Sequence, residues 1–186
     1  NVQAAPVPDF KAPLHGIYLT SHTVANRQGE NLMAEFAKLG GNMIVFDVQD
    51  SGGRLSYPSN LPLSVELDNR NNKIPDLAVT VQKMHDQGFY ATARFVLFKN
   101  GFLAKKEPAW ALKQRNTGKT FFSRDGPIWL DPGNVELKEY LIDIGREIAA
   151  AGVDEIQFDY VRFPEGGRGG YVGYRFTGDE TFSPDQ

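Results

Sequence analysis

Residues 152–165 read GVDEIQFDYVRFPE, a stretch with the form of a buried parallel strand that ends at a surface. Gly152 closes a helical pattern, and polar and apolar residues then alternate up to Asp159. Because successive side chains of a strand point to opposite faces, Ile156 and Phe158 share one face and Asp159 lies on the other. A single carboxylate at a strand end can simply accept hydrogen bonds from the next loop, so the remaining strands decide whether Asp159 belongs to a site.

The composition is that of one ordinary globular domain. The chain has 186 residues, of which 41% are hydrophobic and 23% charged, and no apolar run approaches the roughly 20 residues that span a bilayer. The net charge is −3, without a Lys/Arg cluster that could follow a phosphate backbone, so nucleic acid is not an expected partner. The chain has no cysteine, and its three histidines are not at ligand spacing, so no metal and no cofactor are expected.

Both ends of the chain differ in composition from the middle. Residues 1–13 are rich in Ala and Pro and predict an extended linker, as found after a signal peptide or anchor, although an arbitrary chain boundary explains them equally well. The linker favours an extracellular or cell-envelope protein. Residues 166–186 are rich in Gly and aromatic residues and predict a tail or loop, which leaves 14–165 as the folded domain.

Strand and helix patterns alternate along this domain. Strands are expected at 16–20, 42–50, 90–98 and 155–159, and helices at 30–39, at 74–87 and from Asp131–Pro132 to about Ile148. Long polar connections at 51–73 and 99–131 leave room for a small hairpin near 55–57 and a short helix near 108–113. Such an order predicts an α/β fold with a parallel sheet. A barrel is favoured over a doubly wound sheet, because the turn after the first strand lacks a Gly-rich ligand-binding pattern.

The alternation places polar side chains on the inner face of every strand, near its carboxyl end. These residues are Tyr18, Asp47, Arg94 and Asp159. The residues an odd number of positions away, which point to the other face of each strand, are Ile, Leu, Phe, Val or Ala. A structural ion pair between Asp47 and Arg94 is one explanation. A shared site is the other, and we prefer it because burying an unpaired charge costs several kcal/mol.

Four segments resemble a family of glycoside hydrolase domains that long carried only an uncharacterised-domain label and is distantly similar to alpha-amylase-type barrels. They are FDVQD at 46–50, ARFVLF at 93–98, WLDP at 129–132 and, most specifically, GVDEIQFDYVRFP at 152–164. The resemblance implies that Asp159, at the end of the fourth strand, is the nucleophile or transition-state stabiliser. It also implies a general acid at the end of a fifth strand, but no fifth strand is recognised before the sequence ends.

Four strands are half of what a barrel needs, since a full one has eight strands and about 250 residues. The chain is therefore expected to form an incomplete barrel, its N-terminal half. Half a barrel exposes two strand edges, which predicts self-association or pairing with the missing half. An isolated half without its general acid should hydrolyse glycosides negligibly.

The implied partner is a carbohydrate. The candidate substrate-binding residues are Tyr18, Asp47, Asp50, Arg94, Trp129, Asp131, Tyr160 and Arg162; Asp47, Asp50, Asp131 and Glu165 are the possible second carboxylates. Trp110 and Trp129 either stack on a sugar or pack under the long loop, and His85 is interpreted as structural. Two other functions stay open: a non-catalytic carbohydrate-binding or envelope-assembly module, and an enzyme that uses Lys99 as a Schiff-base amine.

Overall fold

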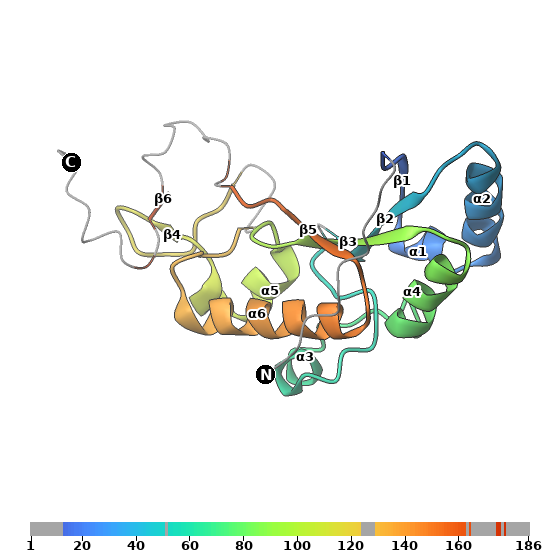
Figure 1. The fold of residues 1–186 in the computed structure, drawn as a ribbon. Coiled ribbons are helices and arrows are strands. Elements are labelled where there is room, and N and C mark those ends of the chain that lie inside the picture. The colour runs from blue at the N-terminus through green and yellow to red at the C-terminus, as the bar shows by residue number, and fades with distance from the viewer. Residues whose placement is uncertain are drawn as a thin grey trace.

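The computed structural model describes residues 13–50, 52–123, 129–162, 164, 174, 175 and 177. Its centre is a parallel sheet in the order β1-β2-β3-β5, in which every strand pairs with its neighbour in the same direction (Figure 1). The strands are β1 (Gly16–Leu19), β2 (Met43–Gln49), β3 (Tyr90–Val96) and β5 (Glu155–Asp159). All four predicted strands are therefore present, and their carboxyl ends meet at one edge of the sheet.

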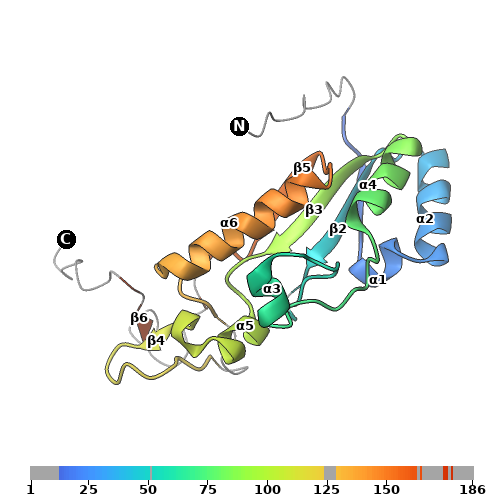
Figure 2. The same ribbon diagram turned by 90° about the horizontal axis from the view of Figure 1, so that it is seen from below.

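The connections between the strands contain the helices. They are α1 (Ser21–Val24), α2 (Arg27–Lys38), α3 (Pro62–Glu66), α4 (Leu77–Asp86), α5 (Gly101–Lys106), the 3-10 helix η1 (Pro108–Trp110) and α6 (Val135–Ala150). The two ribbon views agree that α4 and α6 cover the same face of the sheet, and the opposite face carries no described helix (Figures 1 and 2). This opposite face is the inner side of the expected barrel.

The three longest described helices, α2, α4 and α6, begin at short polar side chains that cap the first turn. Asn26, Asp76 and Asn134 accept hydrogen bonds from the backbone N–H three residues later, at 2.9–3.1 Å. The helix predicted at Asp131–Pro132 therefore begins three residues later than expected, because the side chain of Asp131 binds another segment. The helix expected at 74–87 begins at Leu77, so Pro75 precedes its cap instead of lying in its first turn.

The core lies between the sheet and the helices. Side chains on the outer strand faces, such as Phe46 and Phe95, are fully buried against α4 and α6 residues such as Met84 and Ile144. The apolar alternation that predicted the strands thus faces the helix layer. Helix α6 also anchors the long connection after β2, because Glu147 accepts hydrogen bonds from the Tyr57 hydroxyl at 2.9 Å and the Asn60 amide at 3.1 Å.

The long connections differ locally from expectation. In place of a hairpin at 55–57, Leu55 forms single bridges to Gln49 and Arg70, and α3 follows. The short helix expected near 108–113 is present as the 3-10 helix η1, which follows α5 and ends at Trp110. A two-residue strand β4 (Lys113–Gln114) then pairs with β6 (Tyr174–Arg175). The expected linker lies outside the described residues except for Pro13, as does most of the expected tail.

The sheet is not closed. β1 and β5 are its two edge strands, so the fold is the incomplete parallel barrel expected from the sequence. Phe158 on the outer face of β5 is 55% exposed, as expected on an edge strand. Within the described residues, no helix has the length and apolarity needed to cross a membrane.

Candidate functional site

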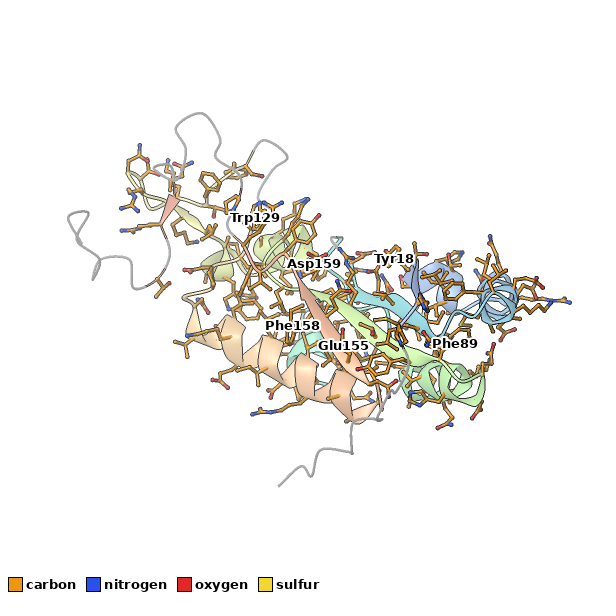
Figure 3. The ribbon with its side chains drawn as sticks, turned by 45° about the horizontal axis from the view of Figure 1, so that its top comes forward. Tyr18, Phe89, Trp129, Glu155, Phe158 and Asp159 are labelled. Atoms are coloured by element: carbon orange, nitrogen blue, oxygen red, sulfur yellow. The ribbon has the colours of Figure 1, made fainter. Side chains whose placement is uncertain are left out.

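The four inner-face residues meet in one hydrogen-bonded network, which we call the inner-face network: Tyr18, Asp47, Arg94 and Asp159. The Tyr18 hydroxyl donates to Oδ2 of Asp47, and Nη1 of Arg94 donates to Oδ1 of the same aspartate at 2.6 Å. Arg94 also binds Oδ2 of Asp159, from Nε at 2.8 Å and Nη2 at 2.6 Å. Figure 3 shows Tyr18 and Asp159 on the side of the sheet away from α6. Sequence alternation thus placed all four side chains correctly.

The two carboxylates of the inner-face network differ in access to solvent. The side chain of Asp47 is 4% exposed, whereas that of Asp159 is 38% exposed, with Arg94 between them at 19%. Because each oxygen of Asp47 already accepts a hydrogen bond, this residue holds Arg94 in place. Asp159 is the carboxylate that a ligand on the open face could reach.

Asp159 is held in its ionised form. Burial alone would raise the pKa of its carboxyl group, but the backbone N–H of Tyr160, the guanidinium of Arg94 and the charge of Arg162 outweigh burial and lower that pKa. The Tyr160 amide donates to Oδ1 at 2.6 Å. An ionised carboxylate can act as a nucleophile or stabilise a cation, but it cannot donate a proton.

The backbone at Tyr160 is strained. Its φ of +54° lies in the left-handed region, which costs a non-glycine residue of order 1–3 kcal/mol. This conformation directs the Tyr160 N–H to the carboxylate of the preceding residue. Strain retained beside a partly exposed carboxylate is common at functional sites, and sequence patterns gave no sign of it.

A second cluster, the aromatic platform, lies beyond the ends of β3 and β5. Trp129 and Leu112 are buried there, with Phe98, Phe121 and Tyr160 packed against them. Trp129 is 5% exposed and meets Tyr160 edge-on, with ring centres 6.2 Å apart. The guanidinium of Arg162 lies 5.3 Å from the centre of the Trp129 ring. Trp129 therefore has the packing role that the sequence left open, and a direct sugar contact through it stays a prediction.

The other predicted residues have partners of their own. Asp50 binds Lys73 at 3.3 Å, and Asp131 accepts hydrogen bonds from the Gly133 amide and from both the amide and hydroxyl of Thr177 at 2.7–2.8 Å. Trp110 is 1% exposed in the core, so it offers no face to a sugar. Glu165 lies outside the described residues.

Two further residues discussed from the sequence, His85 and Lys99, have defined contacts in the structure. His85 in the last turn of α4 binds Asp154 at 2.9 Å, beside the amino end of β5 and thus at the opposite edge of the sheet from Asp159. This pairing agrees with the structural interpretation of His85. The Nζ of Lys99 lies 4.8 Å from the centre of the Tyr160 ring, so it belongs to the aromatic platform.

The described residues contain no group of three His, Asp or Glu side chains that could hold a metal ion.

The helix layer has a pocket of about 160 Å³ between α2 and α4, lined by residues that include Met33, Val79 and Lys83. Because this pocket lies on the helix side of the sheet, it is separate from Asp159.

Residues 16–182 match the model of a family described as "Putative glycosyl hydrolase domain". The chain belongs to this family. The resemblance carried by the four sequence motifs is thereby confirmed. A comparison with curated proteins gives no significant match.

Solved structures agree on the fold of this family member. A hypothetical protein from Ruminiclostridium thermocellum is 32% identical with a TM-score of 0.77, over 86% of this chain and 80% of that one. A maltogenic alpha-amylase from Thermotoga neapolitana is 17% identical with a TM-score of 0.55, over 81% of this chain and 40% of the amylase. An alpha-galactosidase from Lactobacillus brevis is 16% identical with a TM-score of 0.53, over 78% of this chain and 20% of the galactosidase. The two glycosidases show the barrel fold alone, and this chain spans less than half of either.

The bond from Tyr18 to Asp47 gives a first testable prediction for this family member. Burial, followed by the hydrogen bond to Asp47, raises the pKa of the Tyr18 hydroxyl to about 12. Since the folded-state value exceeds the usual ~10, the stability from this group is complete below pH ~10 and is lost as the pH rises toward 12. The difference in phenolate absorbance between the wild type and Tyr18→Phe should show one group titrating near 12. A midpoint near ~10 would mean that neither the burial of the Tyr18 hydroxyl nor its bond to Asp47 persists in solution.

Proposed function

We propose that this chain supplies the nucleophilic part of a glycoside hydrolase active site, with Asp159 as nucleophile or transition-state stabiliser and a carbohydrate as substrate. The observation that carries the proposal is the state of Asp159: it is ionised, oriented through both oxygens and partly exposed, at the carboxyl end of a parallel strand. Barrel enzymes form their active sites at this end of the strands. Family membership supports a carbohydrate as the substrate class, and the fold is shared with glycosidases.

Glycoside hydrolysis also needs a proton donor for the leaving oxygen. Among the described residues, Asp47 is buried and bonded to Arg94, while Asp50 and Asp131 hold loops. None of these three carboxylates is free to act as a general acid across a bond from Asp159. Glu165, the fourth candidate from the sequence, lies outside the described residues. The proposal therefore assigns no general acid and is tested with a substrate that needs none.

A substrate whose leaving group needs no proton tests the nucleophile of the active site separately from its proton donor. With a glycosyl fluoride, Oδ1 or Oδ2 of Asp159 would bond to the anomeric carbon while the C–F bond breaks and fluoride departs with its electron pair. Water then hydrolyses the glycosyl ester and releases the sugar. We expect fluoride release from a member of a panel of α-glycosyl fluorides, and a mass gain of one glycosyl unit on the peptide that contains Asp159.

The matched comparison is Asp159→Asn against Asp143→Asn, a charge-neutralising change at an exposed ion pair on α6. Asp159→Asn should reduce fluoride release by at least about 100-fold, and Asp143→Asn should leave it unchanged. Equal rates in the two variants would exclude Asp159 as the nucleophile.

One observation favours a second candidate, a carbohydrate-binding module without catalysis. Both oxygens of Asp159 already accept hydrogen bonds, from Arg94 and from the Tyr160 amide, which also suits a purely structural carboxylate. A module of this kind would bind oligosaccharides but release no fluoride from any glycosyl fluoride. The same assay therefore separates the two candidates.

A further inference from the structure

The guanidinium of Arg94 connects two carboxylates that have different surroundings. Its Nη1 donates to Oδ1 of Asp47 at 2.6 Å, while Nε at 2.8 Å and Nη2 at 2.6 Å face Oδ2 of Asp159. Asp47 is almost fully buried, and its other oxygen accepts from the Tyr18 hydroxyl. A ligand on the open face can therefore touch Asp159 but not Asp47, which acts on that ligand only by its charge and through Arg94.

The strand pairing places Asp47 and Arg94 side by side. They are direct partners in the β2–β3 register, which shifts immediately afterwards, between Asp47 and Gln49. An irregularity of this kind often re-aims a side chain next to an active site. Gln49 is fully buried and donates from Nε2 to the carbonyl of Val96 at 2.6 Å, and Val96 is the partner of Asp159 in the β3–β5 pairing. The end of β2 is thus tied to the strands that carry Arg94 and Asp159.

Charge gives a reason for a buried aspartate beside Arg94. A glycoside hydrolase stabilises a sugar that becomes positively charged in the transition state. The pair of Arg94 and Asp159 alone has no net charge, whereas the three groups together, with Asp47, carry one net negative charge. Fixed charges that are already in place before the reaction stabilise a developing charge without any reorganisation.

Other charged groups surround these three. Arg162 acts on Asp159 through its charge, from the loop after β5, and has a further interaction of its own. Lys99 lies on the aromatic platform, and Asp50 pairs with Lys73. None of these groups is changed in the variants described below, so their contribution is the same in every protein compared.

We propose that Asp47 is a positioning residue of this site: it holds Arg94 against Asp159 and offsets the charge of the guanidinium, so that the site attracts a sugar that carries positive charge. This role rests on the proposed function, because such a charge develops only if Asp159 acts as nucleophile or stabiliser. An aspartate that served stability alone would hold the strands together without favouring a cation.

Calorimetric titration of the full chain with matched ligands measures this attraction without turnover. Each pair of ligands consists of a protonated piperidine iminosugar, whose ring nitrogen is positively charged, and the neutral hexose of the same configuration. The pairs have the gluco, galacto and manno configurations. The wild type should bind at least one iminosugar about tenfold more tightly than its hexose.

Three variants test whether this preference follows the charge. Asp47→Asn keeps an acceptor oxygen for Arg94 but removes the negative charge, so the preference should fall by about tenfold while the affinity for the hexose changes little. Arg94→Gln removes the cation and should raise the preference. Asp47→Asn with Arg94→Gln restores the original net charge and should recover the preference of the wild type. Because charge fixes the order of the four proteins, three of them still show it if one variant does not fold.

Asp143→Asn, at an exposed ion pair on α6, is the control and should alter neither affinity. Three results would overturn the role of Asp47. They are no preference for any iminosugar in the wild type, an equal loss of affinity for iminosugar and hexose in Asp47→Asn, and no recovery of the preference in the double variant. Fluoride release that depends on Asp159 is measured independently, so a failure of the proposed function can be told from a failure of the role of Asp47.

Discussion

Replacing Arg94 with Met should destabilise the chain by about 3 kcal/mol and lower its melting temperature by roughly 6–12 °C. The change leaves the 4% exposed carboxylate of Asp47 without its cation, and removing one partner of a buried pair typically costs about 3–5 kcal/mol. We expect the lower end because Tyr18 still donates to Asp47. The bond to Asp159 adds less, since that side chain is 38% exposed and solvent screens it. Urea unfolding measures the loss.

Two variants control this experiment. Arg146→Met removes the same kind of side chain from an exposed pair with Asp143 on α6 and should change stability by less than about 0.5 kcal/mol. Adding Asp47→Asn to Arg94→Met replaces the unpaired charge by an amide and should restore part of the loss. If Arg94→Met is no less stable than Arg146→Met, the inner-face network does not hold the strands together.

The acid dependence of stability follows from the same contacts. The folded-state pKa of Asp159 is lowered, so its contribution to stability is present above the unfolded value of ~3.9 and is lost as the pH falls through the folded value. Arg94→Met removes a main cause of that lowering. The stability gap between the wild type and this variant should therefore narrow below about pH 4.

The sequence was sufficient to predict those features of the fold that follow from the two-residue periodicity of a strand. A strand exposes alternate residues to opposite faces, so the positions of Tyr18, Asp47, Arg94 and Asp159 followed from four separate segments once the sheet was taken as parallel. The family motifs then added a role for Asp159.

The remaining features depend on contacts between distant residues, which local patterns do not contain. Asp131 resembles a helix cap, but its carboxylate binds Thr177, so Asn134 caps α6. Nothing local indicates that Tyr160 adopts a positive φ, because the conformation is imposed by its surroundings. Lys99 follows a strand end, which suggested a reactive amine, whereas the fold places it over an aromatic ring 61 positions along the chain.

Trp110 connects the platform loop to the core, so Trp110→Ala should cost about 3–5 kcal/mol and also disturb the aromatic platform. Its ring lies 5.6 Å from that of Tyr140 on α6, its Nε1 donates to Glu136 at 3.0 Å, and its carbonyl accepts from the Asp131 amide at 2.7 Å. The hydrogen bond alone is worth about 1 kcal/mol.

Glu136→Gln keeps an acceptor and the packing of Trp110, and should therefore lose no more than about 1 kcal/mol. Hydrogen exchange distinguishes a general loss of stability from loosening of the platform. In Trp110→Ala, the amide of Leu112, which donates to the carbonyl of Trp129 at 3.2 Å, should exchange faster than the global loss of stability requires. Exchange at Leu112 that follows global stability alone would mean that the loop keeps its structure without this anchor.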